Sequence, residues 1–380
     1  MLNPTWLQDH AETDSSLSSD IAEMITERGN TCISIIVPTH RFANERRGDR
    51  NEVMRAIFAA KEMVQFAGKG LLQRLDECLE DVDLDKNKEG LGLFVSPRIK
   101  KGVKFPFPVT KKIKVNKFFD LHDLLYLENY SLHYFLLDIS KKEIHLFHGL
   151  MDNLEEIKNS DFPRIMEEEY EYSKPSHSSS DAGYTHEKGF EKDKSILGKI
   201  RMKKKFTETD KLLSKYLKNN LPILLCGAEE NVSVFRSVSK FRNHMVGSIS
   251  DNYRGTEIHD LSLLAWLKIR SFIDGQKIKL VNELKEKIGE RLAVTGVEDV
   301  WEATKEGRGL KLLVEKNYSK AAFISPDNNL YSERGGKNFL RYTDAVNEII
   351  TTVLEKKGNV VIVEKDVLQD HERIALILRY

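Results

Sequence analysis

The sequence predicts a multi-domain protein of the mixed α/β class. The chain has 380 residues, and domains usually hold about 100–200 residues, so two or three domains are expected. Short apolar runs bounded by proline or glycine alternate with stretches whose apolar residues recur at helical spacing. The sequence shows no internal repeat and no coiled-coil heptads, which excludes repeat and fibrous architectures.

The elements expected in the first domain, residues 1–128, alternate between strand and helix. Apolar runs predict strands, the spacing of Val53, Ile57 and Leu71 predicts one long helix or two, and the prolines near residue 106 predict extended chain. The expected elements are a strand at Ile33–Arg41, helix at Asp49–Leu79, a strand at Leu91–Pro97, extended chain at Lys104–Val109 and a helix at Phe118–Leu127.

The second domain is expected over residues 129–246. Ser131–Gly149 predicts two strands around a turn. Residues 161–198 are polar and poor in branched aliphatic side chains, so a long mobile loop is expected there, and the basic loop is drawn at residues 165–205. A helix at Lys203–Leu217, a strand at Pro222–Ala228 and a helix at Asn231–Phe241 complete this domain.

The third domain is expected over residues 247–380 as a compact α/β unit with a mixed sheet. A long helix is predicted from about residue 257 to 288, followed by elements of alternating type. These are a helix at 297–307, strands at 310–316 and 321–326, a helix at 343–357 and strands at 359–365 and 374–380.

Composition limits the partners and the compartment. The chain carries 59 basic and 59 acidic residues, so a nucleic-acid partner must be met by local patches rather than by net charge. The three cysteines, Cys32, Cys78 and Cys226, form no CxxC pair, which indicates buried thiols in a reducing compartment. The first residues do not resemble a signal peptide, and no apolar run is long enough to span a membrane, so the cytoplasm is expected.

Two basic stretches in the first domain are candidate RNA-binding sites. Residues 97–119 contain eight Lys or Arg residues, no acid and interleaved phenylalanines, a pattern that can contact phosphates and stack on bases. A solvated edge strand with core phenylalanines is the alternative. The strand-end loop after Ile33–Val37 is a candidate phosphate site, or else a plain surface cluster. The predicted residues are Arg98, Lys100, Lys101, Lys104, Lys111 and Lys112 in the first stretch, and His40, Arg41, Arg46 and Arg47 in the second.

A third basic stretch lies in the predicted loop of the second domain. Residues 187–205 contain eight basic residues against three acidic ones. A charged flexible arm of this kind suits insertion between RNA phosphates, and a merely solvated loop is the alternative. The predicted RNA-binding residues are His177, His186, Lys188, Lys199, Arg201, Lys203, Lys204 and Lys205.

Catalytic and metal-binding patterns are weak. The Ser-rich residues 173–180 with His177 and His186 come with no nucleophile elbow and no fixed acid, and neither HExxH nor a P-loop is present. The sequence therefore predicts no catalytic residue, no cofactor and no metal. A metal site on His133, His145 and His148, which fall on the predicted hairpin, is an alternative to histidines that are satisfied within strands.

The order of several motifs resembles a known superfamily. ISIIVPTHR, LGLFVSP, FPFPV, YFLLDISKKEIHLFHG and PILLCGAEENVSVFR are similar to the bacterial branch of the archaeo-eukaryotic release factors, a superfamily that includes class-1 release factors, Pelota and Balon. TGVEDVWEATKEGRGLKLLVEK, VVIVEKDV and the final IALILRY resemble that superfamily's third domain, whose fold binds RNA kink-turns in ribosomal proteins. The similarity covers most of residues 30–380.

The resemblance implies a three-domain, tRNA-shaped molecule that enters the ribosomal A site. The first domain would face the decoding centre, the second would reach the peptidyl-transferase centre, and the third would dock a translational GTPase such as elongation factor Tu. Residues 165–205 take the place of the release factors' Gly-Gly-Gln loop, yet the sequence contains no Gly-Gly-Gln. The expected function is therefore A-site occupation without peptidyl-tRNA hydrolysis, in ribosome hibernation or in the handling of stalled ribosomes, by a monomer.

Two other functions stay open at this point. One is a peptidyl-tRNA hydrolase that would use His177, His186 or Glu187 of the predicted loop. The other is an RNA-binding adaptor that does not act on ribosomes, which the fold of the third domain alone would allow.

Overall fold

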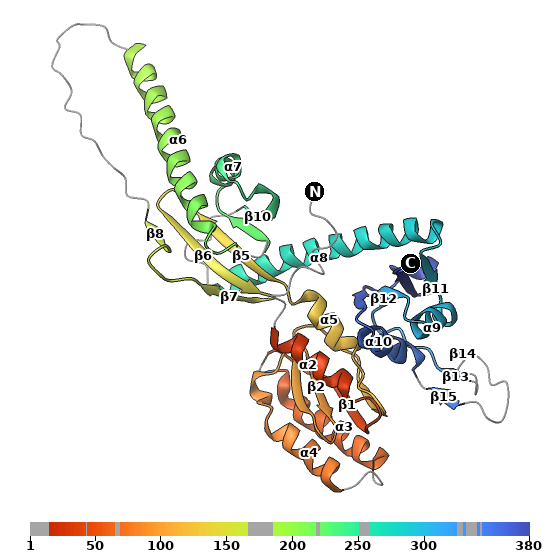
Figure 1. The fold of residues 1–380 in the computed structure, drawn as a ribbon. Helices are drawn as coiled ribbons and strands as arrows, with labels where there is room; N and C mark the ends of the chain where they lie inside the picture. The colour runs from red at the N-terminus through yellow and green to blue at the C-terminus, as the bar shows by residue number, and fades with distance from the viewer. Residues whose placement is uncertain are drawn as a thin grey trace. The chain divides into compact units, whose positions relative to one another are not determined.

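The chain forms two compact units in the computed structural model (Figure 1), which describes residues 15–42, 44–64, 69–165, 185–217, 221–250, 258–324, 330–331, 340–342 and 344–380. Residues 15–129 and 277–380 together form one unit, here called the composite unit. Residues 130–276 form the other, here called the middle unit. The three larger sheets fall largely within the three domains expected from the sequence, although β10 (Met245–Ile249) of the second sheet runs past residue 246, and the first and third sheets lie in the same unit.

The N-terminal half of the composite unit is built on a four-stranded antiparallel sheet in the order β3-β2-β1-β4. Its two central strands are buried on both faces apart from Pro38, which explains their nearly unbroken apolar sequences. The strands are β1 (Cys32–Pro38), β2 (Gly90–Val95), β3 (Lys100–Phe105) and β4 (Lys112–Asn116). The strands predicted at residues 33–41 and 91–97 are confirmed, whereas β4 was not predicted because alternating lysines mask its apolar residues.

Two helices cover one face of this sheet. The stretch predicted as one long helix or two is two, α3 (Asp49–Met63) and α4 (Lys69–Glu80). Their apolar residues, including Val53 and Leu75, pack on Ile33 and Ile35 of β1. The unit also contains α2 (Ser15–Thr26) and most of α5 (His122–Tyr130).

The C-terminal half of the composite unit has the mixed sheet that the sequence predicts. Its order is β11-β17-β12-β16, with β12 parallel to β16 and antiparallel to β17. A second, three-stranded sheet has the order β14-β13-β15. The elements are β11 (Ala293–Thr295), α9 (Val297–Lys305), β12 (Gly309–Glu315), β13 (Ala322–Ile324), β14 (Leu330–Tyr331), β15 (Leu340–Tyr342), α10 (Ala345–Glu355), β16 (Asn359–Val363) and β17 (Ile374–Leu378). The predicted long helix is α8 (Ile258–Gly289), whose residues 258–276 belong to the middle unit and 277–289 to the composite unit.

The middle unit contains a sheet in the order β10-β9-β5-β6-β7, with β8 paired to β6. Strand β9 is parallel to both of its neighbours, β10 and β5. Strand β6 is antiparallel to both β5 and β7. The elements are β5 (His133–Ile139), β6 (Glu143–Leu150), β7 (Asn153–Glu156), β8 (Arg164–Ile165), α6 (Thr185–Leu213), β9 (Ile223–Cys226), α7 (Glu229–Val238) and β10 (Met245–Ile249). The predicted hairpin at residues 131–149 is confirmed.

A close contact fixes the β5–β6 hairpin. The ring of Tyr134 is fully buried and lies over Gly149, which is its cross-strand partner. A Cβ atom on Gly149 would come within 2.2 Å of that ring. The Tyr134 hydroxyl donates to the carbonyl of Met151 at 3.1 Å, so the ring is held at both ends. Only glycine fits at position 149 without moving the tyrosine.

Helix α6 corrects the predicted loop at residues 165–205. Residues 185–213 are one continuous helix, so the loop prediction is wrong for residues 185–205, and residues 166–184 lie outside the described part of the chain. The stretch is rich in Lys, Glu, Ile and Leu, which have good or moderate helix propensity. The low apolar content favours a disordered segment in the sequence, but only the C-terminal part of α6 packs on a core.

The C-terminal part of α6 is anchored in the core of the middle unit. Phe206 and Leu213 are fully buried there. The Phe206 ring packs edge-on against the Phe235 ring of α7, with centroids 5.7 Å apart. Farther toward the N-terminus, residues 198–201 are exposed, and Figure 1 shows α6 extending past the strands of its own unit. No helix within the described ranges is both long and apolar enough to cross a membrane.

We expect the Phe206→Ala substitution to lower the unfolding free energy of the middle unit by about 3–5 kcal/mol, because a fully buried aromatic ring would leave a cavity. Urea unfolding followed by circular dichroism and by hydrogen exchange in β5 and β9 measures this loss. Ile200→Ala on the same helix is the matched control, since Ile200 is 58% exposed and should change stability by less than about 0.5 kcal/mol. Equal losses in the two variants would contradict the anchoring role of Phe206.

Candidate nucleic-acid interface

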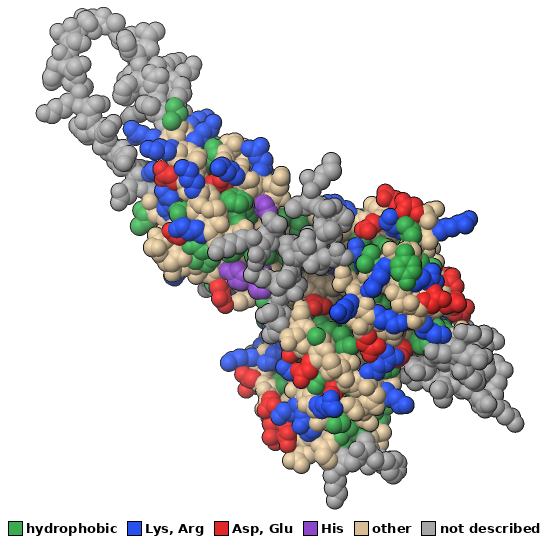
Figure 2. Space-filling view, in the orientation of Figure 1, with side chains coloured by type: hydrophobic (Ala, Val, Ile, Leu, Met, Phe, Trp, Pro, Cys, Tyr) green, Lys and Arg blue, Asp and Glu red, His purple; other side chains and the backbone are tan. Residues whose placement is uncertain are grey.

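Exposed lysines on α6 form the clearest cationic surface of the middle unit. Lys199, Lys203 and Lys204 are exposed, and within the described part of the chain they form no ion pair. Lys199 and Lys203 are four residues apart, so they lie on the same side of the helix. Figure 2 shows Lys and Arg side chains gathered along this part of the molecule. These ammonium groups are available to bind anions without breaking an existing contact.

The other predicted residues of this stretch differ in their surroundings. Arg201 is exposed and Lys205 is half-buried, and each already takes part in an interaction. His186 and Lys188 lie in the first turn of α6, and His177 lies outside the described residues. Of the predicted residues in this stretch, the best candidates for an RNA contact are therefore the exposed lysines Lys199, Lys203 and Lys204.

The loop after β1 uses Arg46 to hold its own backbone together. The Arg46 guanidinium donates to the carbonyl of His40 at 3.1 Å and also to the carbonyls of Arg41 and Asp85. Because three carbonyls already accept its hydrogens, Arg46 supports the loop rather than presenting a free phosphate ligand. Of the four predicted residues of this loop, Arg47, in the short 3-10 helix η1 (Arg46–Gly48), is exposed and forms no ion pair with a described residue.

His40 and Arg41 of the same loop also have partners. The backbone N–H and the Nδ1 atom of His40 lie 2.8 and 2.6 Å from the carboxylate of buried Asp49. The hydrogen bond that His40 donates to Asp49 raises the pKa of His40. Arg41 lies 3.7 Å from Glu89. The loop is therefore cationic but internally braced, and its predicted RNA contact stays a prediction.

The basic segment at residues 98–112 is matched by carboxylates and carbonyls of its own unit. The interleaved Phe105, Phe107 and Phe118 are at most 9% exposed, so they pack in the core and cannot stack on bases. The segment contributes to β3 and leads into β4, the two edges of the described sheet, where lysines discourage pairing with another chain. The partners are Glu27 for Arg98, Asp81 for Lys100, Asp20 for Lys101, the carbonyl of Lys86 for Lys104, Glu52 for Lys111 and Asp123 for Lys112.

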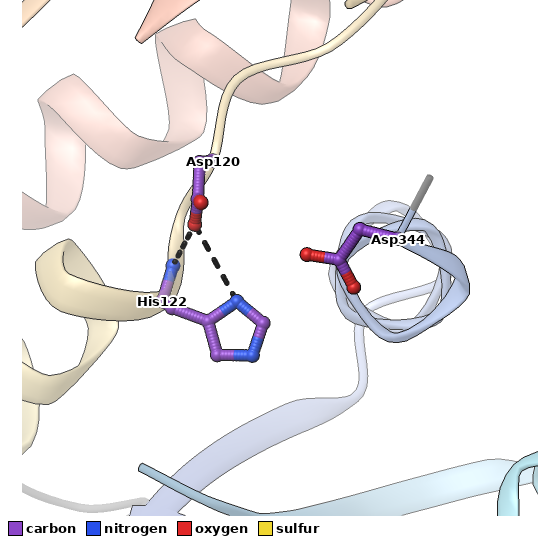
Figure 3. Close-up of side chains that lie close together, drawn as sticks. All are labelled: Asp120, His122 and Asp344. Atoms are coloured by element: carbon purple, nitrogen blue, oxygen red, sulfur yellow. Dashed lines mark hydrogen bonds and ion pairs between the residues drawn. The ribbon is translucent and has the colours of Figure 1, made fainter. Parts of the chain in front are cut away.

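A buried ionic cluster in the composite unit was not predicted from the sequence. The ammonium of Lys114 lies 2.6 Å from a carboxylate oxygen of Asp120 and 2.6 Å from one of Asp344. The Nδ1 atom of His122 lies 3.4 Å from the other oxygen of Asp120. Figure 3 shows Asp120, His122 and Asp344 converging from two segments. Asp344 is 230 residues from Lys114, so no local pattern could reveal the contact.

The geometry of the cluster explains its charges. Burial favours the neutral form of Asp120, but the hydrogen bond from His122 and the charges of Lys112 and Lys114 outweigh it and hold the pKa of Asp120 well below its usual range. Burial likewise favours neutral Lys114, yet the charges of Asp120 and Asp344 prevail and raise its pKa. Asp120 and Lys114 are therefore both charged at neutral pH.

Within the described ranges, one set of three or more His, Cys, Asp or Glu side chains has its possible ligand atoms close enough together for a metal ion. The set is Asp120, His122 and Asp344, whose ligand atoms all lie within 4.8 Å of one another. Lys114, however, already supplies positive charge between the two carboxylates. Asp344 also accepts from the N–H of Asn347 at 3.2 Å and so caps α10. The arrangement therefore joins two segments of one unit and does not need an ion.

Comparison with known proteins concerns mainly the middle of the chain. Residues 133–308 match the family described as bacterial archaeo-eukaryotic release factor family 3. The matched segment begins at β5, contains α6 with its exposed lysines, and ends just before β12. No curated protein sequence matches the chain.

Several solved structures are similar to this chain over long stretches at low identity. The archaeal translation termination factor aRF1 covers 97% of this chain and 98% of its own at 13% identity, with a TM-score of 0.24. Archaeoglobus fulgidus Pelota covers 77% and 84% at 15% identity, with a TM-score of 0.35. Ribosome-bound archaeal Pelota, described together with ABCE1, covers 96% and 94% at 12% identity, with a TM-score of 0.39. Similarities this low do not extend the family match beyond residues 133–308.

We expect Lys114→Met to destabilise the composite unit by about 3–5 kcal/mol, because it leaves two buried carboxylates without a counter-ion. Thermal and urea unfolding measure the loss. Lys111→Met is the matched control, since Lys111 pairs with the exposed Glu52 and should cost no more than about 1 kcal/mol. Restored stability in the triple variant with Asp120→Asn and Asp344→Asn would confirm that the uncompensated charges cause the loss.

Acid should unfold the composite unit partly through Asp120. Its folded pKa is lowered, so its contribution to stability is fully present above the unfolded value of about 3.9 and is lost as pH falls toward the folded pKa. The dependence of unfolding free energy on pH between about 5 and 2 should therefore be weaker in Asp120→Asn than in the parent chain. Parallel pH profiles for the two proteins would show that Asp120 does not titrate as the structure implies.

Proposed function

We propose that this chain is a ribosome-binding translation factor that occupies the A site without hydrolysing peptidyl-tRNA, in ribosome hibernation or in the handling of stalled ribosomes. The exposed lysines of α6 within the release factor family segment are the observation that carries the proposal. They lie on a helix that is already formed and anchored, in the part of the chain whose relatives are release factors.

The charge distribution favours α6 over the other two basic stretches as the main RNA contact. An ammonium that already pairs with a carboxylate must give up that contact before it binds a phosphate, which reduces the net gain. Lys199, Lys203 and Lys204 carry no such cost among the described contacts, whereas Lys100, with Asp81, does. Arg47 would be the corresponding free cation in the loop after β1.

The absence of peptidyl-tRNA hydrolysis follows from the chemistry of the missing motif. In the related release factors, two adjacent glycines permit the backbone conformation that places a water at the ester, and the glutamine orients the reaction. The sequence contains no Gly-Gly-Gln, so the chain lacks the groups that would position that water. Binding without chemistry is the role left to it.

The proposed partners follow from the same assignment. The ribosome would be met through ribosomal RNA, and the α/β part at residues 277–380, which contains no long basic run, would meet a protein such as a translational GTPase, for example elongation factor Tu. Action on the ribosome places the chain in the cytoplasm, and a monomer suffices for one A site.

Co-sedimentation with 70S ribosomes in a salt series tests the proposal. Binding should weaken steeply with salt, because each phosphate contact releases counter-ions. Substituting alanine at Lys199, Lys203 and Lys204 should reduce the slope of log affinity against log salt by about 2–3, at roughly 0.7–0.9 for each contact. Peptidyl-tRNA in stalled complexes should stay intact throughout the incubation.

Two triple variants with the same change of charge serve as controls. Alanines at Lys141, Lys142 and Lys158, exposed lysines of the same unit of which Lys141 pairs with Glu230 and Lys158 with Glu156, should leave the slope unchanged. Alanines at Lys100, Lys101 and Lys111, which are paired, should change it by less than the α6 variant does. An unaltered salt slope in the α6 variant would contradict the proposed interface. Absence of the chain from the 70S fraction would favour a non-ribosomal adaptor. Cleavage of the peptidyl-tRNA ester would favour a hydrolase.

A further inference from the structure

His40 is held by a buried carboxylate while much of its own side chain stays in solvent. The Nδ1 atom of His40 lies 2.6 Å from one oxygen of Asp49, and the backbone N–H of His40 donates to the other oxygen at 2.8 Å. The side chain of Asp49 is 4% exposed, whereas that of His40 is 52% exposed. An ionised carboxylate can only accept hydrogen bonds, so the hydrogen of the neutral ring is on Nδ1. Nε2 is therefore the atom that gains and loses a proton, and it has no partner among the described residues.

The surrounding loop fixes this orientation of the imidazole. Arg46 donates to the backbone carbonyls of His40 and Arg41, which holds the chain on one side of the ring. On the other side, the amide of buried Asn87 donates to Asp49 at 3.4 Å, which holds the carboxylate. The ring is thus positioned by the fold before any ligand binds.

The charged groups that face the imidazole favour its protonated form. The hydrogen bond to Asp49 raises the pKa of His40, slight burial lowers it, and the negative charges of Asp49 and Glu45 raise it again. Arg46 approaches the His40 carbonyl rather than the ring. The imidazolium is therefore fully present below the ordinary pKa of about 6.5 and is lost as pH rises through the raised value.

Protonation of His40 also doubles the net charge of its loop. Residues 40–49 contain three arginines and two acidic residues, so their net charge is +1 when His40 is neutral and +2 when it is charged. Arg47 in this loop is exposed and forms no ion pair with a described residue. Guanidinium and imidazolium N–H groups are both donors that suit phosphate oxygens.

The histidines of the β5–β6 hairpin do not offer the same arrangement. The Nδ1 atom of His145 lies 2.7 Å from Glu156, and its Nε2 atom lies 3.3 Å from a second carboxylate, so both nitrogens have partners. His133 and His148 contact each other, with Nδ1 and Nε2 3.0 Å apart. His145 is an odd number of residues from His148 along β6, so it points to the opposite face, and the three histidines do not form the metal site considered from the sequence.

We propose that His40 is a proton-dependent contact for an RNA phosphate, in which Asp49 holds Nδ1 and the protonated Nε2 donates to a phosphate oxygen. When the ring is neutral, Nε2 carries a lone pair, which repels a phosphate oxygen instead of binding it. Ribosome binding through this loop should thus be stronger at mildly acidic pH and weaker at alkaline pH. The inference rests on the proposed function and adds a dependence on pH to it.

Co-sedimentation with 70S ribosomes in salt series at about pH 6 and about pH 9 tests the contact. For the parent chain, the slope of log affinity against log salt should be shallower by about 0.7–0.9 at the higher pH, as expected when one phosphate contact is lost. His40→Gln keeps a neutral polar side chain and should have the shallower slope at both pH values. His259→Gln is the matched control, since His259 of α8 is exposed, and it should behave as the parent chain does.

NMR titration of the histidine rings tests the role of Asp49. Asp49→Asn keeps an oxygen for His40 Nδ1 but removes the charge, so the titration midpoint of His40 should fall. The pH at which ribosome affinity changes should fall by the same amount. Glu45→Gln, at an exposed position, should shift both quantities in the same direction by less, and it gives the same test if circular dichroism shows that Asp49→Asn does not fold. Unchanged midpoints would contradict the positioning role of Asp49.

The outcomes distinguish this contact from the interface proposed for α6. An equal difference between the two pH values in the parent chain and in His40→Gln overturns the His40 contact. The α6 triple variant should keep the difference, whatever it does to affinity. Absence of the chain from ribosomes at both pH values contradicts the proposed function and the RNA contact together. Shifts of the His40 signals with inorganic phosphate, without pH-dependent ribosome binding, would assign the loop to free phosphate and overturn the RNA contact.

Discussion

The ammonium of Lys114 between the carboxylates of Asp120 and Asp344 is the contact on which the composite unit depends most. It links β4 to the residue that caps α10, across 230 positions of sequence. Asn347 reinforces the link, since its side chain donates to the carbonyl of Phe119 at 2.8 Å and accepts from the N–H of Leu121 at 3.2 Å. A buried pair of this kind adds little net stability when intact and costs several kcal/mol when one partner is removed. It therefore specifies which segments meet more than it strengthens the fold.

Local patterns were enough to predict most of the strands and helices, and they failed where local and tertiary signals conflict. The apolar run at Ile33–Val37 and the spacing of Val53 and Ile57 predict their elements because burial imposes those periods directly. Strand β4 was not predicted because lysines alternate with its two apolar residues, and its order comes from pairing with β1. The N-terminal part of α6 escaped because its stability comes from helix propensity and from the anchored turns around Phe206 rather than from an apolar stripe.

The sequence was enough to predict which cations are candidates for RNA binding. It could not show which of them are already paired within the protein. A sequence shows Lys101 and Lys199 as equivalent basic residues in equivalent basic runs. Their difference lies in Asp20, which is 81 positions from Lys101 and pairs with it at 2.6 Å. Similarly, the core position of Phe105 could not be told from an exposed stacking position until the sheet was known. Long-range partners thus decide which charges of a basic run are free to bind.

The continuous helix at α6 has a thermodynamic consequence. Ordering a disordered arm on RNA would cost about 1–2 kcal/mol per residue in backbone entropy, and burial by the newly folded segment would give association a large negative heat-capacity change. Residues 185–213 are already helical, so neither term arises from them. Association through this helix should instead have the calorimetric signature of rigid-body docking, dominated by ion release, and its temperature dependence should be shallow.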